Sequence, residues 1–381
     1  MDIYYVTFSL FPTKAAHSLH IMKICQALAD NGHNVTIVAP DYSNKPGELK
    51  KIEPGINDLY GFYNVKENFS IVKLLLINFK GWRKVFPFTA AKYVAKKQNA
   101  LVFTRHNEIA AATTLYGVPT IMEYHHVDVP ESFFNRFLYN KMLKSKYLLH
   151  IVAISEALKK ALQETGITKQ IVVAHDGSDL PANTRVEKLD HKDQYDLEAG
   201  YVGHLYPGKG MEVILSIAGQ LPKVRFNIVG GNPADISEWQ TKVEEQGIKN
   251  IVFHGFVTQS HISGFIYAFD VCLLPNQRKV SIWGNSSVNI SDFTSPLKMF
   301  DYMAHGKVII ASDLPVLREV LDTDCAILCD PDKPGTWIDA LNYLAANKQE
   351  CDKLGANGLK KFKEGYTWRK RAEKIIDSVS I

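Results

Sequence analysis

The sequence predicts an α/β fold class with two doubly wound, Rossmann-like parallel sheets, and three observations support it. Short apolar runs rich in β-branched residues alternate with amphipathic helical segments along nearly the whole chain. The apolar runs are almost unbroken, which is typical of parallel strands covered by helices on both faces. The 381 residues suffice for two or three domains, and a polar, aperiodic stretch at residues 184–199 separates two rounds of alternation.

The first round opens with a strand at Ile3–Phe8 and a helix at Ser18–Asn31. Apolar residues in that helix recur at i, i+3, i+4 and i+7, and Gly32 is expected to end it. The later strands of this half are short apolar runs beside helical segments: Val35–Ala39, Leu101–Thr104, Thr120–Glu123, Ile151–Ile154 and Ile171–Val173.

The second round repeats the same architecture. Its predicted strands are Gly200–Val202, Arg225–Val229, Ile251–Phe253, Val271–Leu274, Val308–Ala311 and Ala326–Leu328. Its predicted helices are Met211–Gly219, Ile236–Gln246, Ser260–Ala268, Leu297–His305 and Thr336–Asn347, followed by a charged helical segment from Gln349. We expect an N-terminal domain at residues 1–185, a C-terminal domain at 186–360, and a helix in 361–381 that could pack back on the first domain. Two such domains would face a central cleft, with ligands at the carboxyl ends of the strands.

Composition excludes several classes of protein. Apolar residues make up 46% and charged residues 22%, which indicates an ordinary globular protein rather than a disordered one. The net charge of +4 is too small to indicate nucleic-acid binding. Five widely spaced cysteines without a C-x-x-C pattern predict reduced, mostly buried thiols in a cytoplasmic protein. We find neither a signal-peptide pattern nor an apolar run of about 18 residues, so no membrane span is expected.

A glycine-rich turn after the first strand of the second half predicts a phosphate site. It reads Gly203-His204-Leu205-Tyr206-Pro207-Gly208-Lys209-Gly210 and precedes a helix. Glycines let backbone amides approach an anion, and the helix N-terminus and Lys209 add positive charge. The alternative is a plain tight turn with a solvated lysine, because the spacing fits neither standard phosphate-loop pattern.

A second helix start predicts another part of the same site. Pro296 suits a first helical turn, and Thr294 or Ser295 can cap it, so that amides near Leu297 face the ligand. Asp301 follows about one turn later, where a carboxylate can accept hydrogen bonds from the two hydroxyls of a ribose. Taken alone, Asp301 would be a surface acid. Together, two helix N-termini, a lysine and a diol-binding acid indicate a nucleoside diphosphate.

Eight motifs carry a resemblance to a known family. They are Val202–Gly210, Ile228–Gly231, Val252–Val257 and Ser295–Lys307 in the second half, and Ala16–His20, Ala27–His33, Val152–Leu158 and His175–Asp179 in the first. At these motifs the chain resembles GT-B glycosyltransferases of the retaining family 4, in a form common among bacterial surface-polysaccharide members. The turn at residues 202–210 is similar to that family's G-R-L-x-x-x-K-G sequence.

The resemblance implies a metal-independent transferase without a cofactor. It would move a hexose-like sugar from a UDP- or GDP-linked donor, with retention, to a glycan or lipid-linked glycan in lipopolysaccharide or capsule synthesis. Fixed positive groups would stabilise the departing diphosphate, and we hypothesise that the donor β-phosphate takes the acceptor proton. Two D-x-D matches, Asp322–Asp324 and Asp330–Asp332, lie in turn-like context, which does not favour a metal role.

The resemblance also implies roles for individual residues. The catalytic set is Lys209, His125 and Asp301. Diphosphate contacts are assigned to Gly203, His204, Gly208, Gly210, Thr294, Ser295, Pro296 and Leu297, and nucleoside contacts to Gly230, Phe256, Val257 and Asp301. The acceptor or sugar side would hold Lys14, His17, Glu123 and His126, with Glu123 orienting His125; a core or surface role for these histidines is the alternative.

The sequence departs from the family pattern at several positions. His204 stands where arginine is usual, Asp301 where glutamate is usual, and Phe293 where the first acid of the family's acid pair would fall. Residues 13–16 replace the usual N-terminal Gly-Gly loop. Two other functions therefore stay open, a catalytically silent sugar-nucleotide-binding relative and a GT-B sugar-nucleotide 2-epimerase.

The segment at residues 66–97 is basic and rich in apolar residues. Its cations outnumber its only acid, Glu67; they are Lys66, Lys73, Lys80, Arg83, Lys84, Lys92, Lys96 and Lys97. Such a surface could rest on anionic lipid at the inner face of the membrane. The other interpretation is a basic pair of helices with one buried face.

Overall fold

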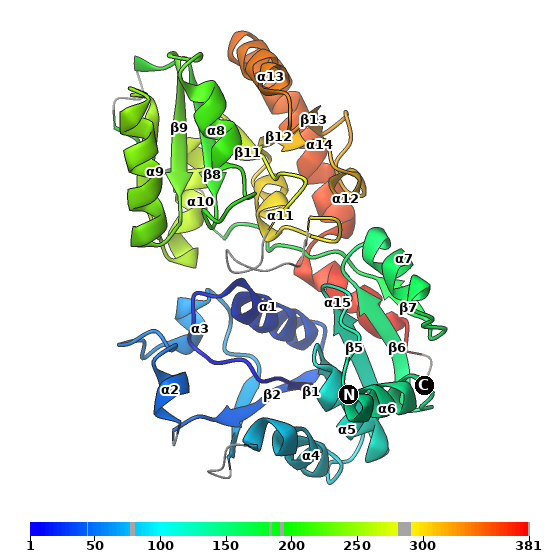
Figure 1. Cartoon of the computed structure of the whole chain (residues 1–381). Helices are drawn as coiled ribbons and strands as arrows, with labels where there is room; N and C mark the ends of the chain where they lie inside the picture. Colours follow the sequence, from blue (N-terminus) through cyan, green and yellow to red (C-terminus); the bar gives the residue numbers. More distant parts are fainter. Residues whose placement is uncertain (44, 77–80, 183–184, 191–193, 281–290, 380–381) are drawn as a thin grey trace. The chain divides into compact units, whose positions relative to one another are not determined.

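The computed structural model describes residues 1–43, 45–76, 81–182, 185–190, 194–280 and 291–379. The chain divides into two compact units, each built on one parallel sheet (Figure 1). Unit 1 comprises Met1–His175 and Trp368–Ile381, and unit 2 comprises Asp176–Thr367. Across the described residues, no helix combines the length and apolarity needed to cross a bilayer.

The sheet of unit 1 has the strand order β3-β2-β1-β4-β5-β6-β7, and all its pairings are parallel. The strands are β1 (Asp2–Val6), β2 (Asn34–Asp41), β3 (Ser70–Leu75), β4 (Ala100–Thr104), β5 (Thr120–Tyr124), β6 (Leu148–Ala153) and β7 (Ile171–Val173). The helices are α1 (Ala16–Asp30), α2 (Pro46–Leu49), α3 (Leu59–Phe62), α4 (Trp82–Val94), α5 (Asn107–Leu115), α6 (Phe133–Leu143), α7 (Glu156–Glu164) and α15 (Trp368–Asp377).

Helices cover both faces of this sheet, as the apolar strands require. Helix α1 packs against α15, and α4, α5 and α6 form a contiguous row. Figure 1 shows the two groups on opposite sides of the strands. The C-terminal helix α15 thus belongs to unit 1, and its Arg371 side chain is one of the few buried charges of that unit.

The segment 66–97 is not a pair of helices, because it contains the edge strand β3 followed by the helix α4. Strand β3 pairs with β2. Its exposed Lys73 interrupts the apolar run, so hydrophobic patterning does not predict a strand here. The aromatic residues Trp82 and Phe86 of α4 lie in the core of unit 1, and the segment presents its cations to solvent together with Leu75, which is 78% exposed. Lys80 lies outside the described residues.

The sheet of unit 2 has the order β10-β9-β8-β11-β12-β13, again all parallel. The strands are β8 (Leu197–Val202), β9 (Val224–Val229), β10 (Ile251–Gly255), β11 (Val271–Leu274), β12 (Val308–Ser312) and β13 (Ala326–Cys329). The helices are α8 (Met211–Ala218), α9 (Pro233–Glu245), α10 (Gln259–Ala268), α11 (Leu297–Ala304), α12 (Pro315–Arg318), α13 (Pro334–Ala346) and α14 (Lys348–Gly365).

Strand β8 begins three residues before the start predicted from the sequence. The prediction missed these residues because they include an acid, Glu198, which turns out to be buried. Glu198 is 1% exposed and accepts hydrogen bonds from Arg225 at 2.8 and 2.9 Å and from Asn227 at 2.7 Å. These partners offset the free-energy cost of removing the carboxylate from water. Hydrophobic patterning alone predicts that a glutamate is exposed to solvent, so it does not predict a buried strand here.

The boundary between the units falls at residues 175/176, whereas the sequence placed it at 185/186. Ser178 explains the difference, since it pairs with Thr367 as an isolated bridge and donates a hydrogen bond to Asp301 at 2.5 Å. These contacts attach the segment after Asp176 to unit 2.

Each sheet reverses its strand order at one place, which is the expected position for a ligand. In unit 2 the reversal lies between β8 and β11, and in unit 1 between β1 and β4. In open α/β sheets ligands bind outside the carboxyl ends of the strands at such a point. The turn at Gly203–Gly210 directly follows β8, so unit 2 carries the predicted phosphate turn at this position.

Candidate functional site

The turn after β8 has a backbone that only glycine accommodates. Gly203, Gly208 and Gly210 all have positive φ, at +145°, +82° and +114°. A Cβ at Gly208 would collide with the carbonyl of Lys279, and one at Gly210 with Pro275. The Gly208 carbonyl also accepts a hydrogen bond from the amide of Gln277 at 2.9 Å. The turn is therefore held tightly against the loop that follows β11.

Lys209 lies in this turn, immediately before the N-terminus of α8. Burial lowers the pKa of its ammonium group below the ordinary lysine value. Within the described ranges its side chain has no hydrogen-bond or ion-pair partner, which leaves a half-buried amine available to an anion.

A second amine at this site was not predicted from the sequence. The Nζ atom of Lys298 is buried without a hydrogen-bond partner among the described residues and lies 3.7 Å from the ring centroid of Tyr201. The Lys298 Nζ also lies close to the glycine turn. A Cβ atom added at Gly203 would be only 2.9 Å from this nitrogen. Burial, and then the nearby charge of Lys209, lower the pKa of Lys298 well below its ordinary value.

The position of Lys298 in the sequence is the signal that could have found it. It is the second residue of α11, where the helix macrodipole disfavours a cation. A residue that breaks a local rule in a buried position indicates a functional site.

His204 adds a third basic group beside the turn. Its ring stacks on Tyr206 with centroids 4.9 Å apart and an angle of 6° between the planes. Burial lowers the pKa of His204, and the charges of Lys298 and Lys209 lower it further. An acid, Glu212, also lies beside the turn, where its carboxylate accepts a hydrogen bond from the Gly208 amide at 3.2 Å. Its other oxygen has no partner in the described part of the chain.

The N-terminus of α11 differs from the predicted cap. Pro296 is the N-cap residue, and no side chain among the described residues caps the helix. Ser295, one of the two alternative caps expected, is 7% exposed and accepts a hydrogen bond from the Asp176 amide at 2.9 Å. This contact uses the serine oxygen for a tertiary hydrogen bond, so no cap from the described side chains reaches the first-turn amides of α11.

Asp301 and the predicted nucleoside residues lie in the same unit. One carboxylate oxygen of Asp301 accepts the hydrogen bond from Ser178, so this acid has a structural contact besides its proposed ribose role. Gly230 follows β9 with a φ of +114°, and a Cβ there would collide with the Gly203 carbonyl. Phe256, 47% exposed, follows β10 together with Val257. Gly230 thus packs against the backbone of the phosphate turn at Gly203. Phe256 and Val257 follow β10, an edge strand of the sheet.

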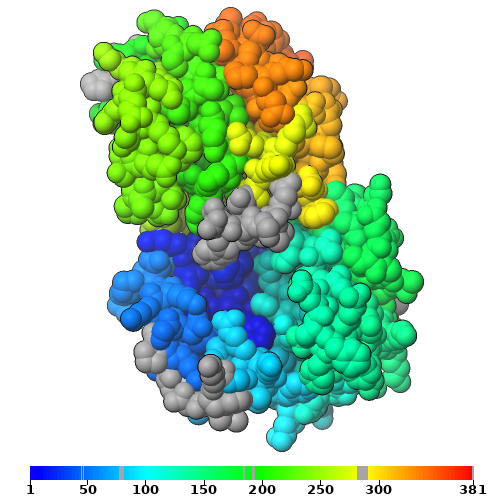
Figure 2. All heavy atoms as spheres, viewed as in Figure 1, coloured from blue at the N-terminus to red at the C-terminus, as the bar shows by residue number. Residues whose placement is uncertain are grey.

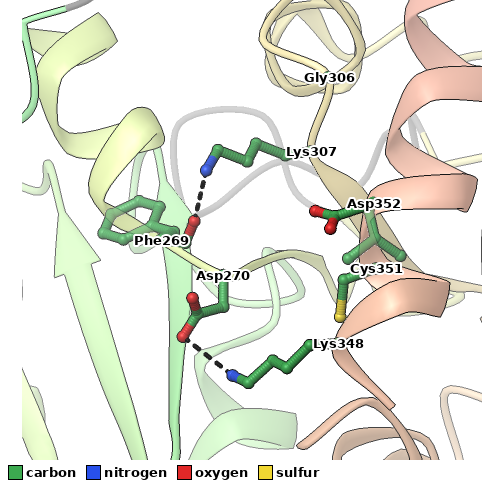
Figure 3. A pocket seen from close by; sticks show the side chains of 8 residues that line it. Phe269, Asp270, Gly306, Lys307, Lys348, Cys351 and Asp352 are labelled. Carbon is green, nitrogen blue, oxygen red and sulfur yellow. Dashed lines mark hydrogen bonds and ion pairs between the residues drawn. The ribbon is translucent and has the colours of Figure 1, made fainter.

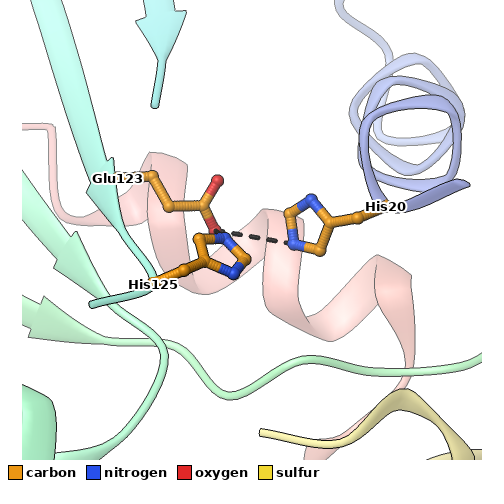
Figure 4. A group of neighbouring side chains, drawn as sticks. All are labelled: His20, Glu123 and His125. Atoms are coloured by element: carbon orange, nitrogen blue, oxygen red, sulfur yellow. Dashed lines mark ion pairs between the residues drawn. The ribbon is translucent and has the colours of Figure 1, made fainter. Parts of the chain in front are cut away.

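Of the residues predicted in unit 1, Glu123 and His125 lie together in a cluster with His20 (Figure 4). The same carboxylate oxygen of Glu123 lies 3.3 Å from His125 Nε2 and 3.6 Å from His20 Nε2. The two imidazole rings are 4.9 Å apart. Arg371 of α15 donates a hydrogen bond to this carboxylate as well.

The charge of this cluster is balanced by Arg371. Burial alone would raise the pKa of Glu123, but Arg371, His20 and His125 hold it well below its ordinary value. Burial and the charge of Arg105 lower the pKa of His125 to about 4, so this imidazole is neutral. Two histidines and a carboxylate within 4.8 Å of one another could ligate a metal ion, yet the guanidinium already neutralises Glu123 and would repel a cation. We interpret the cluster as a support that orients His125.

The remaining unit 1 residues are more peripheral. Lys14 forms an ion pair with Glu53 at 2.9 Å, and His126 is half-buried. His17 lies in the first turn of α1, and burial followed by the charge of Arg105 lowers its pKa to about 4.

Other charged groups of unit 2 are occupied by partners. Arg278 binds Asp330 and Asp332, and Lys361 binds Asp322, so the D-x-D matches serve in ion pairs. A hollow before β11 and β12 (Figure 3) contains two lysines at the opposite edge of the sheet. There Lys307 donates to the Phe269 carbonyl at 2.7 Å, and Lys348 lies 3.5 Å from Asp270. Lys209 and Lys298 differ from these lysines, because neither has such a partner in the part of the chain that the structure describes.

The five cysteines are free and buried, as predicted. They lie in helices, strands and turns of both units, and burial raises the pKa of the Cys25 and Cys272 thiols. The thiols therefore contribute to packing.

Comparison with known proteins agrees with this architecture. Residues 18–181 match the family model described as Glycosyltransferase Family 4, and residues 197–347 match the one described as Glycosyl transferases group 1. The chain is 21% identical to the O-antigen chain mannosyltransferase C of Escherichia coli, over 88% of this chain and 81% of that protein. It is also 21% identical to an uncharacterized 41.2 kDa protein in the cps region of Klebsiella pneumoniae, and this match spans 59% of the chain and only 61% of that relative.

A solved structure confirms the fold. The HepE protein of Anabaena, in complex with UDP, superposes with a TM-score of 0.74 at 14% identity over 100% of both chains. The two sheets and these matches define the class as a glycosyltransferase with the GT-B fold. The chain belongs to glycosyltransferase family 4, so the predictions of fold class and family are confirmed.

Proposed function

We propose that the protein is a retaining hexosyltransferase that uses a UDP- or GDP-linked sugar and acts in the synthesis of a cell-surface polysaccharide. The observation that carries the proposal is a pair of amines, the buried Nζ of Lys298 and the half-buried Lys209, beside a glycine turn and the N-terminus of α11 at the carboxyl edge of unit 2. A group with two full negative charges fits this arrangement.

The chemistry follows from where charge develops. When the bond between the sugar and the diphosphate breaks, negative charge grows on the leaving phosphate, and fixed donors aimed at that charge lower the barrier. Lys209, Lys298 and the first amides of α11 would supply this stabilisation. Because two ammonium groups can provide the charge that a divalent ion would otherwise supply, we propose a metal-independent reaction without a cofactor.

The proton and the sugar need further groups. We propose that the β-phosphate of the donor accepts the proton of the attacking hydroxyl, which keeps the reaction independent of a side-chain base. Asp301 is assigned to the ribose, and Gly230, Phe256 and Val257 to the nucleoside. His125, held by Glu123, is assigned to the sugar by family resemblance.

The relatives support the substrate class. HepE has been solved with UDP and with UDP-glucose, and the E. coli relative is named as an O-antigen chain mannosyltransferase. We therefore propose a nucleotide-sugar donor and a glycan or lipid-linked glycan acceptor. We also propose that the protein works in the cytoplasm at the inner face of the membrane, where the exposed cations of segment 66–97 contact anionic lipid.

A screen of nucleotide sugars tests the proposal. A UDP- or GDP-sugar that binds should raise the unfolding temperature, because a ligand bound to the folded state stabilises it by mass action. Addition of a glycan acceptor should then release the nucleoside diphosphate.

The outcomes separate the alternatives. Binding of the nucleotide sugar without release of nucleoside diphosphate, whichever acceptor is offered, would favour a catalytically silent sugar-nucleotide-binding protein. This outcome is tested because Phe293 stands where the family has an acid. Conversion of the free sugar nucleotide to its epimer would favour a 2-epimerase, and absence of any thermal shift would contradict the proposal.

A further inference from the structure

The beginning of α6 exposes three phenylalanines in unit 1. Phe133, Phe134 and Phe137 are 90%, 64% and 52% exposed. Figure 2 shows the segment that contains α6 (teal) on the surface of this unit. Exposed apolar residues are common singly, but a cluster of large aromatic side chains on one helix indicates a binding surface.

The folding of α6 does not require these side chains. The helix buries Tyr139 and Met142 against the rest of unit 1, at 4% and 1% exposure. Phe133, Phe137 and Lys141 recur at i, i+4 and i+8, so they lie along one ridge of the helix that points away from the buried face. The Lys141 Nζ lies 5.6 Å from the ring centroid of Phe137.

Cations surround the exposed phenylalanines. Residues 131–146 contain one acid, Glu131, and four cations: Arg136, Lys141, Lys144 and Lys146. All four cations are exposed. A long lysine beside an aromatic ring can keep its ammonium group in water while the ring enters an apolar phase.

The same edge of unit 1 carries further positive charge. Helices in a parallel α/β sheet run against the strands, so the N-termini of α4 and α6 both lie at the carboxyl edge of the sheet. The N-terminus of α4 presents exposed Arg83 and Lys84, although Arg83 also contacts Glu48 at 3.4 Å. His125, which follows β5, lies at this edge too.

We infer that Phe133, Phe134 and Phe137 insert into the interfacial layer of a bilayer that contains anionic phospholipid, with Arg136 and Lys141 at the headgroups. The combination of protruding aromatic rings with a basic surround complements such a surface. A protein partner fits less well, because the centres of protein–protein interfaces are depleted in charged residues, lysine included. The inference adds an exposed aromatic anchor to segment 66–97, whose aromatic residues Trp82 and Phe86 are buried although its Leu75 is 78% exposed.

Vesicle binding tests the inference with the full-length chain. Vesicles of phosphatidylcholine with about 30% phosphatidylglycerol should sediment the wild-type protein at low salt, and pure phosphatidylcholine should bind it less. The triple variant Phe133→Ser, Phe134→Ser, Phe137→Ser should lose about tenfold or more in vesicle affinity. The control variant Leu115→Ser, Tyr116→Ser also removes two exposed apolar side chains, which lie at the C-terminal end of α5. Leu115 and Tyr116 are 46% and 45% exposed. This control variant should bind vesicles as wild type does.

Fluorescent labelling gives a direct readout of insertion. All five native cysteines are buried, so a single Phe133→Cys substitution can be labelled selectively with an environment-sensitive dye. Anionic vesicles should shift its emission to the blue, and the same label at Leu115→Cys should not respond.

Equal vesicle affinity of the triple variant and wild type, or an unshifted label at position 133, would overturn the inference. So would a loss of self-association in the triple variant seen by light scattering without vesicles, which would assign the patch to a second copy of the chain. Nucleotide-induced thermal shifts should persist in the triple variant, so a failure of this inference is distinguishable from a failure of the proposed function.

Discussion

Replacement of Lys298 by methionine should change stability and nucleotide affinity in opposite directions. Methionine keeps an unbranched side chain of similar size and removes the amine, whose Nζ has no hydrogen-bond partner among the described residues. A buried polar group without a partner costs about 1–3 kcal/mol. The cation–π contact with Tyr201 offsets this cost only while the amine is charged, and burial disfavours that form.

We therefore expect the free Lys298→Met protein to be more stable than wild type by about 1 kcal/mol or more. For a folding unit of about 190 residues this corresponds to a rise of roughly 2–4 °C in the unfolding temperature. Scanning calorimetry or urea unfolding of the full chain without nucleotide measures it.

The same substitution should weaken the binding of UDP. Two unit charges about 4 Å apart interact by about 4 kcal/mol at an effective dielectric constant of 20. Protonation of a lysine with a depressed pKa consumes about 1.4 kcal/mol for each unit by which that pKa lies below the pH. A net loss of roughly 10- to 100-fold in UDP affinity follows, measurable by titration calorimetry.

A matched control is Lys353→Met on α14, where the side chain is 65% exposed and contacts Glu350 at 3.2 Å. It should leave both the stability of the free protein and the UDP affinity near wild type. If Lys298→Met instead destabilised the free protein and bound UDP as wild type does, the assignment of Lys298 to an anion site would be wrong.

Further predictions concern the other site residues. Lys209→Ala should lower sugar transfer by roughly a hundredfold or more, as for the loss of one charge-stabilising donor; full activity of this variant would contradict the assignment. Asp301→Ala should weaken nucleotide binding in calorimetry, and unchanged affinity would remove this acid from the site. Arg371→Met should destabilise unit 1 by about 3–5 kcal/mol in urea unfolding, because it leaves the buried Glu123 carboxylate unpaired. The free wild-type protein should gain stability as the pH rises from the depressed pKa of Lys298 toward the ordinary lysine value, because the unfolded chain binds more protons there. The Lys298→Met variant should lack this component of the pH dependence.

Much of the fold could be predicted because the strands of a doubly wound sheet are apolar on both faces. The runs at Val35–Ala39 and Val271–Leu274, for example, lie inside β2 and coincide with β11. Prediction failed where a charge interrupted the pattern. Lys73 concealed the edge strand β3, which faces solvent on one side, and Glu198 concealed the start of β8, where tertiary partners from β9 satisfy it.

The candidate site was predictable where backbone conformation restricts the residue type. The glycines and Lys209 of the turn after β8 could be identified because positive φ angles select glycine at fixed positions. Lys298 could not be assigned by the same reasoning, since its role depends on burial beneath a turn almost a hundred residues away in sequence. The partner of Ser295 and the contact of Arg371 with Glu123 are likewise tertiary. Local sequence predicts an N-cap at Ser295 and a surface cation at position 371.

The central claim is that a diphosphate binds between Lys209 and Lys298 and charges the buried amine. Titration calorimetry of UDP binding near pH 8, in two buffers with different ionisation enthalpies, measures the protons exchanged. We expect a net proton uptake on UDP binding to the wild-type protein, because burial lowers the pKa of Lys298 in the free protein, and a smaller uptake in Lys298→Met. UDP binding to wild type without proton uptake, or with an uptake that the loss of Lys298 leaves unchanged, would contradict the claim.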